Sequence, residues 1–266
     1  MGEITLGQYY PSNSILHHLD PRVKFVGTIL YIVSLFLVQS WIGYAFCGCF
    51  LALLIVLSKV PFRFILKSMK PIFFILIVTM LFNLFLTPGE VLWQWWIFRI
   101  TGEGLVMAAK MGIRLTFLVM GSSIMTLTTT PNSLTDGMER LFSFLTKIRV
   151  PVHEIAMMMS IALRFIPILT EETDKIKKAQ MARGADFETG GIIRRMKSMI
   201  PILVPLFVSA FRRANDLAMA MEARCYHGGT GRTQMKPLCY ARRDFIAYVV
   251  LLAYLAACII LGHFGL

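Results

Sequence analysis

Two short motifs, each containing an Ala-Arg pair, are the residues of this 266-residue sequence best suited to recognising another molecule. Ala182-Arg183-Gly184 and Ala223-Arg224-Cys225 each close a segment that is apolar at its start and charged later. An arginine in the last turn of a helix suits the negative end of the helix dipole, and its planar guanidinium can pair bidentately with a carboxylate in a groove of another protein. The small residues beside each arginine would permit insertion. The alternative is that both arginines are ordinary solvated residues at helix ends.

Residue types that support catalysis or metal binding show no recognisable arrangement. Residues 228–233 are glycine-rich but lack the Gly-Lys-Ser/Thr ending of a phosphate-binding P-loop, so we expect a turn. No serine lies in a nucleophile-elbow motif, and the spacing of Cys225, His227 and Cys239 is too irregular for more than a weak zinc signal. We therefore expect no catalytic, cofactor-binding or metal-binding residues in this chain.

The composition is typical of an integral membrane protein. Hydrophobic residues make up 56% of the sequence, charged residues only 16%, and the mean hydropathy is +0.66. The formal charge of +12 would suggest nucleic-acid binding in a soluble protein. Here the basic residues cluster between apolar runs, as the positive-inside rule and anionic lipid headgroups favour. We expect contact with a lipid bilayer and none with nucleic acid.

Charge-free runs predict five transmembrane helices. Residues 25–58 would form a helix of about 50 Å, too long for one span, and Gln39, Ser40 and Gly43 mark the expected break between spans one and two. Later charge-free or nearly charge-free runs predict the other three spans, at residues 71–89, 105–128 and 245–266.

Span four carries Lys110 and Arg114, four positions apart on one helical face. In hydrocarbon each charge would cost a few kcal/mol, roughly 3, unless it finds a partner or reaches the headgroups. Both side chains reach the headgroups in one interpretation. In the other they face a protein or aqueous groove, as structural or functional intramembrane cations.

The region between spans four and five predicts helices outside the hydrocarbon core. It contains a short amphipathic segment after Pro131 and two helical rods, at residues 152–183 and 199–224. Because the apolar part of each rod is too short for a span, we expect both rods to lie at the interface and project into water. The predicted fold is an all-α membrane protein with a division into residues 1–130, 131–242 and 243–266: four spans, a cytoplasmic helical module and the last span.

The chain resembles the transmembrane T component of energy-coupling factor (ECF) transporters. These are vitamin and metal importers of the ATP-binding cassette (ABC) class in prokaryotes. The resemblance covers nearly the whole chain and departs from the family pattern at Cys225, where glycine is common. It rests on five motifs: Leu19-Asp20-Pro21-Arg22, Thr128-Thr129-Thr130-Pro131, Ala162-Leu163-Arg164-Phe165-Ile166-Pro167, Ala179-Gln180-Met181-Ala182-Arg183-Gly184 and Glu222-Ala223-Arg224.

The resemblance implies a non-catalytic coupling subunit in the plasma membrane of a prokaryote, with its N-terminus and coupling helices in the cytoplasm. Two ABC-type ATPase subunits would bind ATP and Mg²⁺, and a small membrane S component would bind the vitamin or metal. The alternatives are a self-sufficient membrane permease and a membrane-bound enzyme. The residues that the resemblance assigns to ATPase binding are Ala182, Arg183, Gly184, Ala223, Arg224 and Cys225.

Overall fold

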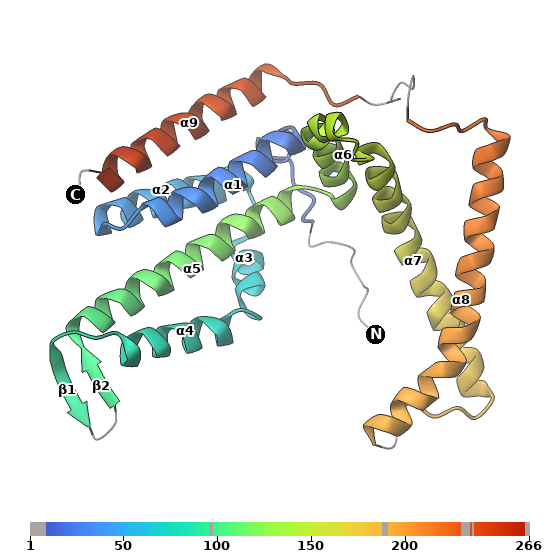
Figure 1. Ribbon diagram of the computed structural model, residues 1–266, viewed down its shortest axis with the longest axis horizontal. Helices are drawn as coiled ribbons and strands as arrows, with labels where there is room; N and C mark the ends of the chain where they lie inside the picture. Colours follow the sequence, from blue (N-terminus) through green and yellow to red (C-terminus); the bar gives the residue numbers. More distant parts are fainter. Residues whose placement is uncertain (1–8, 96–97, 188–190, 230–234, 236, 264–266) are drawn as a thin grey trace. The chain divides into compact units, whose positions relative to one another are not determined.

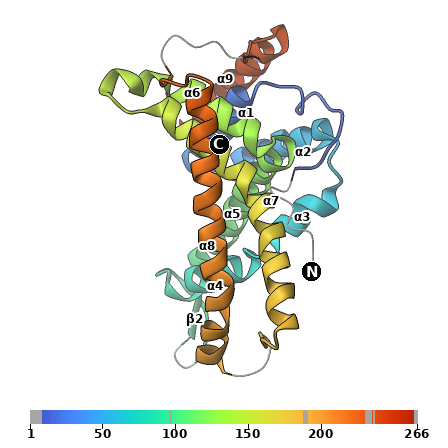
Figure 2. The same ribbon diagram turned by 90° about the vertical axis from the view of Figure 1, so that its right-hand side faces the viewer.

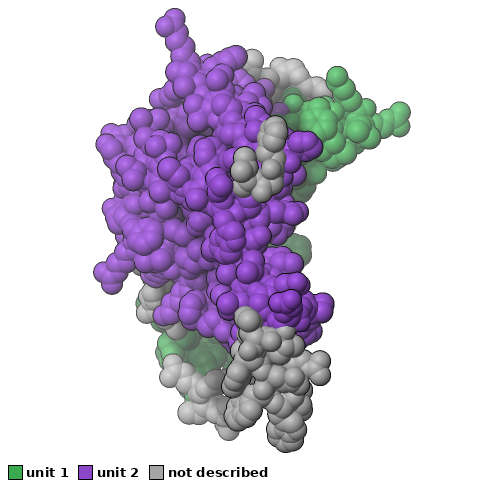
Figure 3. Space-filling view, turned by 90° about the vertical axis from the view of Figure 1, so that its left-hand side faces the viewer, with its two compact units in different colours: residues 1–6, 141–237 green, residues 7–140, 238–266 purple. Residues whose placement is uncertain are grey.

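The computed structural model describes residues 9–95, 98–187, 191–229, 235 and 237–263. The chain forms two compact units, distinguished by colour in Figure 3. One comprises residues 7–140 and 238–266 and is called here the membrane bundle. The other comprises residues 1–6 and 141–237 and is called the helix pair. The functional division at residues 130 and 242 stays a prediction.

The membrane bundle contains seven labelled helices and one β-hairpin in its described part (Figure 1). Its helices are α1 (Pro21–Leu37), α2 (Trp41–Ser58), α3 (Phe62–Met69), α4 (Phe73–Leu86), α5 (Gly102–Thr128), α6 (Pro131–Phe142), which ends at the boundary with the other unit, and α9 (Arg242–His263). The hairpin consists of the antiparallel strands β1 (Val91–Trp95) and β2 (Phe98–Thr101), with Trp95 opposite Phe98. This hairpin between spans three and four was not expected from the sequence.

The predicted break between spans one and two is confirmed. Helix α1 ends at Leu37 and α2 begins at Trp41. Ser40 starts the new helix because its hydroxyl accepts a hydrogen bond of 3.1 Å from the Gly43 amide, which would otherwise lack a partner. The third predicted span, residues 71–89, contains the 14-residue helix α4, and the short helix α3 precedes it at an angle of 61°.

The core of the bundle lies where α1, α2, α5 and α9 pack together (Figure 1). Leu35, Cys47, Leu127 and Tyr254 come from these four helices and are nearly or fully buried. Close packing needs a small residue on α5, since a Cβ at Gly121 would collide with the Tyr31 ring.

Three polar side chains inside this core contact one another. The Ser34 hydroxyl lies 2.8 Å from the Tyr254 hydroxyl, which donates to the Cys47 sulfur at 3.2 Å. Buried hydroxyl groups without such partners would be costly, and lipid offers none. The contacts therefore fix α9 in register against α1 and α2.

The starts of α1 and α9 are joined by a network that we call the clasp, formed by Asp20, Arg22, Leu238, Tyr240 and Asp244. Arg22 donates to both carboxylate oxygens of Asp20, at 3.0 and 2.9 Å, and to the Leu238 carbonyl at 3.2 Å. Its guanidinium lies 3.9 Å from the centre of the Tyr240 ring. The Asp244 carboxylate accepts from the backbone amide of Asp20 at 2.9 Å and from that of Ala241 at 2.7 Å. The clasp thus connects residues more than two hundred positions apart.

The helix pair contains η1 (Ser143–Ile148), α7 (Val152–Ala182) and α8 (Ile192–Ala223). Helices α7 and α8 run antiparallel, as Figures 1 and 2 show. Two contacts fix this direction: Arg213 forms an ion pair of 3.0 Å with Glu172, and the Gln180 side chain donates to the Pro201 carbonyl at 3.4 Å. Both predicted rods are therefore present as long continuous helices.

Four helices of the described residues are long and apolar enough to cross a membrane: α2, α5, α7 and α9. The bent pair of α3 and α4 could form a fifth span. These findings confirm an all-α membrane protein. The expectation that the first rod is too short in its apolar part to cross the membrane needs correction. Helix α7 has 31 residues and is long and apolar enough to be a transmembrane span. Helix α1 has 17 residues, which is at the lower limit of the length that crosses a bilayer.

The clasp should make the folded protein less stable at acidic pH. Burial raises the pKa of Asp20, but the hydrogen bonds from Arg22 outweigh burial, so the pKa lies below its usual value of 3.8. The stabilisation is therefore present above pH 3.8 and is lost as the pH falls through the lowered pKa of the folded state. We expect Asp20→Asn, which keeps a helix-capping side chain, to lower stability at pH 7 by about 2 kcal/mol.

The measurement is thermal unfolding of the detergent-purified chain between pH 7 and pH 3. The wild-type midpoint should fall more steeply at the acid end than that of Asp20→Asn. Parallel curves for the two proteins would show that Asp20 does not carry this dependence.

Candidate functional site

The first arginine motif ends α7 in a tight reversal of the chain. The amide of Gly184 donates to the Met181 carbonyl at 3.0 Å, and the amide of Ala185 donates to the Gln180 carbonyl at 3.0 Å. This pair of bonds is the Schellman motif, which needs a left-handed residue, and Gly184 supplies it with a φ of 86°. Arg183 is thereby held as the last residue before the turn.

The second motif ends α8 in the same way. The amide of Cys225 donates to the Glu222 carbonyl at 2.8 Å, and the amide of Tyr226 donates to the Met221 carbonyl at 3.0 Å. Cys225 occupies the position equivalent to Gly184 and has a φ of 54°. The departure from glycine therefore leaves the backbone of this tip unchanged, at the steric cost that a left-handed side chain carries.

Both tips are accessible. Arg183 and Arg224 are exposed, as are Ala182, Gly184, Ala223 and Cys225 around them. A Cβ built at Gly184 would have no atom of the described residues, other than its two chain neighbours, within 4 Å. The neighbours of each arginine are small, so each helix end presents a guanidinium on a narrow support. Such a shape can enter a groove of a partner.

The antiparallel arrangement separates the two tips. The two helices cross: the end of α7 contacts the first third of α8 through Gln180 and Pro201, and Glu172 of α7 contacts Arg213 in the last third of α8 (Figure 1). At 1.5 Å per residue, the 23 residues of α8 from Pro201, beside the end of α7, to Arg224 span about 35 Å. The tips therefore lie at opposite ends of the helix pair and suit two separate binding grooves.

Arg114 in the membrane bundle donates to groups of the protein. Its side chain bonds to the Tyr44 hydroxyl at 3.0 Å and to the Val38 carbonyl at 3.3 Å. Val38 caps the end of α1, so a cation here meets the negative end of that helix. Lys110 lies 5.8 Å from the centre of the Trp41 ring. Arg114 is therefore a cation that faces the protein. Within the described residues, Lys110 has only this ring contact.

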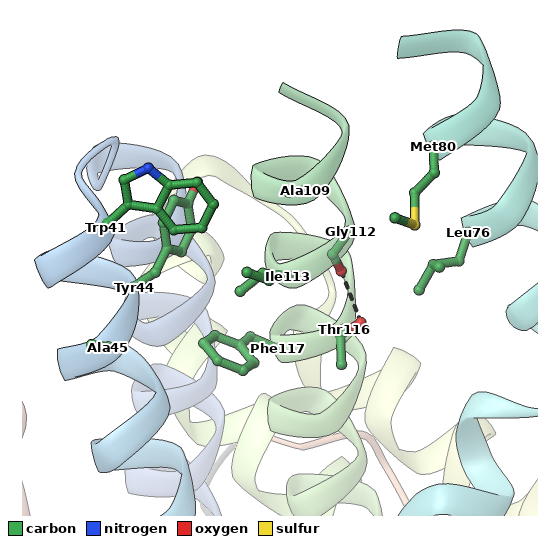
Figure 4. A pocket seen from close by; sticks show the side chains of 10 residues that line it. All are labelled: Trp41, Tyr44, Ala45, Leu76, Met80, Ala109, Gly112, Ile113, Thr116 and Phe117. Carbon is green, nitrogen blue, oxygen red and sulfur yellow. Dashed lines mark hydrogen bonds between the residues drawn. The ribbon is translucent and has the colours of Figure 1, made fainter. Parts of the chain in front are cut away.

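An apolar pocket of about 610 Å³ lies beside these cations, between α2, α4 and α5. Figure 4 shows Trp41 and Tyr44 on one side, Ile113 and Phe117 of α5 in the middle and Met80 on the other side. The hydroxyl of Thr116 is engaged with the Gly112 carbonyl at 2.8 Å. No charged residue lines this pocket, so it offers little to select a polar solute.

The described residues contain no group of three or more His, Cys, Asp or Glu side chains placed to hold a metal ion. His227 contacts the Cys225 carbonyl through Nδ1 at 2.9 Å. The predicted glycine-rich turn lies mainly outside the described residues, although Gly228 has a positive φ of 99°.

Comparison with known proteins identifies the family. A family model described as "Cobalt transport protein", CbiQ, matches residues 12–236. This chain belongs to that family. A curated relative from Clostridium kluyveri, "Energy-coupling factor transporter transmembrane protein EcfT", is 56% identical over 247 residues, which cover 92% of each chain. Proteins of the same name from Acidaminococcus fermentans and Bacillus subtilis are 52% and 46% identical, over 94% and 97% of both chains.

Family membership confirms the resemblance to ECF transporter T components. The chain is thus a multi-pass transmembrane component of a transporter, which favours this class over a membrane-bound enzyme. The contacts expected of the two arginine tips stay predictions. Sequence reasoning missed the clasp and the partners of Arg114. The one signal for the clasp was Asp244, a carboxylate just before a charge-free run.

Exchanging the left-handed residues of the two tips should have opposite effects. Cys225→Gly removes the steric cost of a left-handed side chain, about 1 kcal/mol, and should slow hydrogen exchange at the end of α8 about fivefold. Gly184→Ala introduces that cost and should speed exchange at the end of α7 by a similar factor. Hydrogen–deuterium exchange with mass spectrometry measures both. Equal exchange in Cys225→Gly and wild type would contradict the strain at this position.

Arg114 and Lys110 should differ in their contribution to stability. Arg114→Met leaves the Tyr44 hydroxyl and the Val38 carbonyl without this donor and should cost about 2 kcal/mol. Lys110→Met serves as the control, because it removes a single ring contact worth about 0.5–1 kcal/mol. Thermal unfolding in detergent compares the two. An equal loss in both variants would contradict the role given to the Arg114 hydrogen bonds.

Proposed function

We propose that this chain is the non-catalytic coupling subunit of an ECF-type ABC importer for a micronutrient, a vitamin or a metal. It links two cytoplasmic ATPase subunits to a small membrane S component that binds the substrate. Closure of the ATPases moves the helix pair, and this motion is transmitted to the S component. ATP and Mg²⁺ belong to the ATPase subunits, and the chain itself holds no cofactor.

One observation carries this proposal: the same arginine-bearing turn occurs at both ends of an antiparallel helix pair. A single ATPase groove would need only one tip. Two tips separated by about 35 Å along α8 suit two ATPase subunits, each receiving one arginine. Arginine fits this role because its guanidinium forms two parallel hydrogen bonds to a carboxylate, which fixes direction as well as distance.

The apolar surface of the helix pair provides the contact for the S component. On α8, exposed apolar side chains recur at helical spacing through Met199, Leu203, Phe207 and Phe211. An exposed apolar stripe of this kind marks a surface that binds an apolar partner. Flexible side chains such as methionine can adapt to the shape of that partner. We assign it to the S component, which lies in the same membrane.

The proposed orientation places the N-terminus and both tips in the cytoplasm of a prokaryotic cell. It is supported by the basic residues that flank spans one to three, since cytoplasmic loops carry an excess of lysine and arginine. Arg22 and Lys24 precede the first span, and Lys59, Arg63 and Lys67 follow the second. ATP is a cytoplasmic substrate, so the tips must face that compartment for the ATPases to reach them.

Charge reversal at the tips tests the proposal. Arg183→Glu and Arg224→Glu should each abolish capture of one ATPase subunit, because a carboxylate then faces a carboxylate, and the double variant should capture none. Substrate uptake by cells should fall at least tenfold in each variant, as expected for a lost charge-assisted pair. The measurements are co-purification from membranes in mild detergent and uptake of labelled substrate.

Lys175→Glu on α7 and Arg212→Glu on α8 are the matched controls, since both residues are exposed and lie eight and twelve residues before the arginine of their own tip. Their ATPase capture and uptake should stay near the wild-type level. Full uptake by the double tip variant would overturn the proposal. An equal loss in the control variants would assign the effect to general surface charge.

A further inference from the structure

A narrow groove of about 250 Å³ lies in the membrane bundle between α1, α2, α5 and α9. Each of these four helices contributes one residue to each end of the groove. The inner end is apolar and formed by Tyr31, Phe50, Gly121 and Val250. The outer end, which we call the mouth, is formed by Lys24, Leu57, Thr128 and Arg243. On every helix the two positions are two turns apart, so the groove is about 10 Å long.

The mouth is positively charged. Lys24 donates through Nζ to the carbonyls of His17 and Thr128, at 3.2 and 2.9 Å, and these acceptors are neutral. Arg243 is exposed at the start of α9. The carboxylates nearest to Lys24 have other partners: that of Asp20 pairs with Arg22, and that of Asp244 accepts from two backbone amides. Two cations therefore flank an apolar slot.

We propose that this groove binds one anionic phospholipid, with an acyl chain in the slot and the phosphate group at Lys24 and Arg243. The length supports this, because 10 Å covers about two thirds of the hydrocarbon of one leaflet, which is about 15 Å thick. The charge also fits, since phosphate accepts bidentate hydrogen bonds from arginine. That the lipid comes from the cytoplasmic leaflet rests on the orientation proposed above, whereas the binding itself does not.

Other occupants fit the groove less well. A helical segment of a partner, about 10 Å across and 10 Å long, would fill roughly 800 Å³, far more than the groove offers. Free inorganic phosphate would meet the mouth but leave the apolar walls uncovered, which is unfavourable. A phospholipid matches both ends at once.

The test measures lipid binding to the detergent-purified full chain by native mass spectrometry, with phosphatidylglycerol and phosphatidylcholine as the two probes. Phosphatidylglycerol should bind more tightly to the wild type. Arg243→Gln should weaken its binding about fivefold, the effect of one arginine near a membrane surface. Arg242→Gln is the matched control, because Arg242 is the exposed neighbour that does not line the groove.

A second variant tests the slot rather than the charge. Ala247 lines the groove, and Ala247→Phe should fill it and weaken binding of phosphatidylglycerol while leaving the thermal midpoint in lipid-free detergent near the wild-type value. Equal binding of the two lipids, or equal losses in Arg242→Gln and Arg243→Gln, would overturn the proposal. So would an Ala247→Phe variant that loses a co-purifying protein but keeps its lipid, since a partner helix would then be the occupant. ATPase capture is measured separately and does not enter these outcomes.

Discussion

Helix ends in this protein must satisfy their own terminal amide and carbonyl groups, and most of the structure follows from how they do so. Lipid supplies no hydrogen bonds, so a helix that ends in a membrane bundle needs side chains from elsewhere in the chain. At the end of α1 the donor is Arg114, which reaches the Val38 carbonyl from α5. At the start of α1, the Asp20 side chain caps its own helix. The carboxylate of Asp244 on α9 accepts a hydrogen bond from the Asp20 backbone amide. These contacts tie the first, fourth and last predicted spans into one bundle.

The same requirement is met differently at the ends of α7 and α8. There the chain turns back on itself, and its own amides donate to the last carbonyls. No side chain is needed for capping, so Arg183 and Arg224 are left exposed for another partner. An arginine placed at such a tip also benefits from the negative end of its helix. The two tips thereby become contact points without weakening the helices that carry them.

Charge is distributed in accordance with this division of roles. Within the bundle, Arg22 and Arg114 are engaged with carboxylate, carbonyl and hydroxyl groups, and each lies over an aromatic ring. Arg183, Arg224 and Arg243 are exposed instead. A guanidinium that holds the fold cannot at the same time bind a partner, and the positions of these five residues separate the two tasks.

The sequence by itself determined the parts of the molecule that depend on local pattern. Charge-free or nearly charge-free runs located α1, α2, α4, α5 and α9. Polar residues indicated the break at Ser40, and the small residues beside each arginine marked the two tips. The tertiary structure decided what depends on residues far apart: the clasp between Asp20 and Asp244, the partners of Arg114, and the antiparallel direction that separates the tips. The left-handed backbone of Cys225 also emerged only there, because its side chain type does not favour that conformation. Hydrophobic periodicity reports which face of one helix is apolar, but it carries no information on which other helix covers that face.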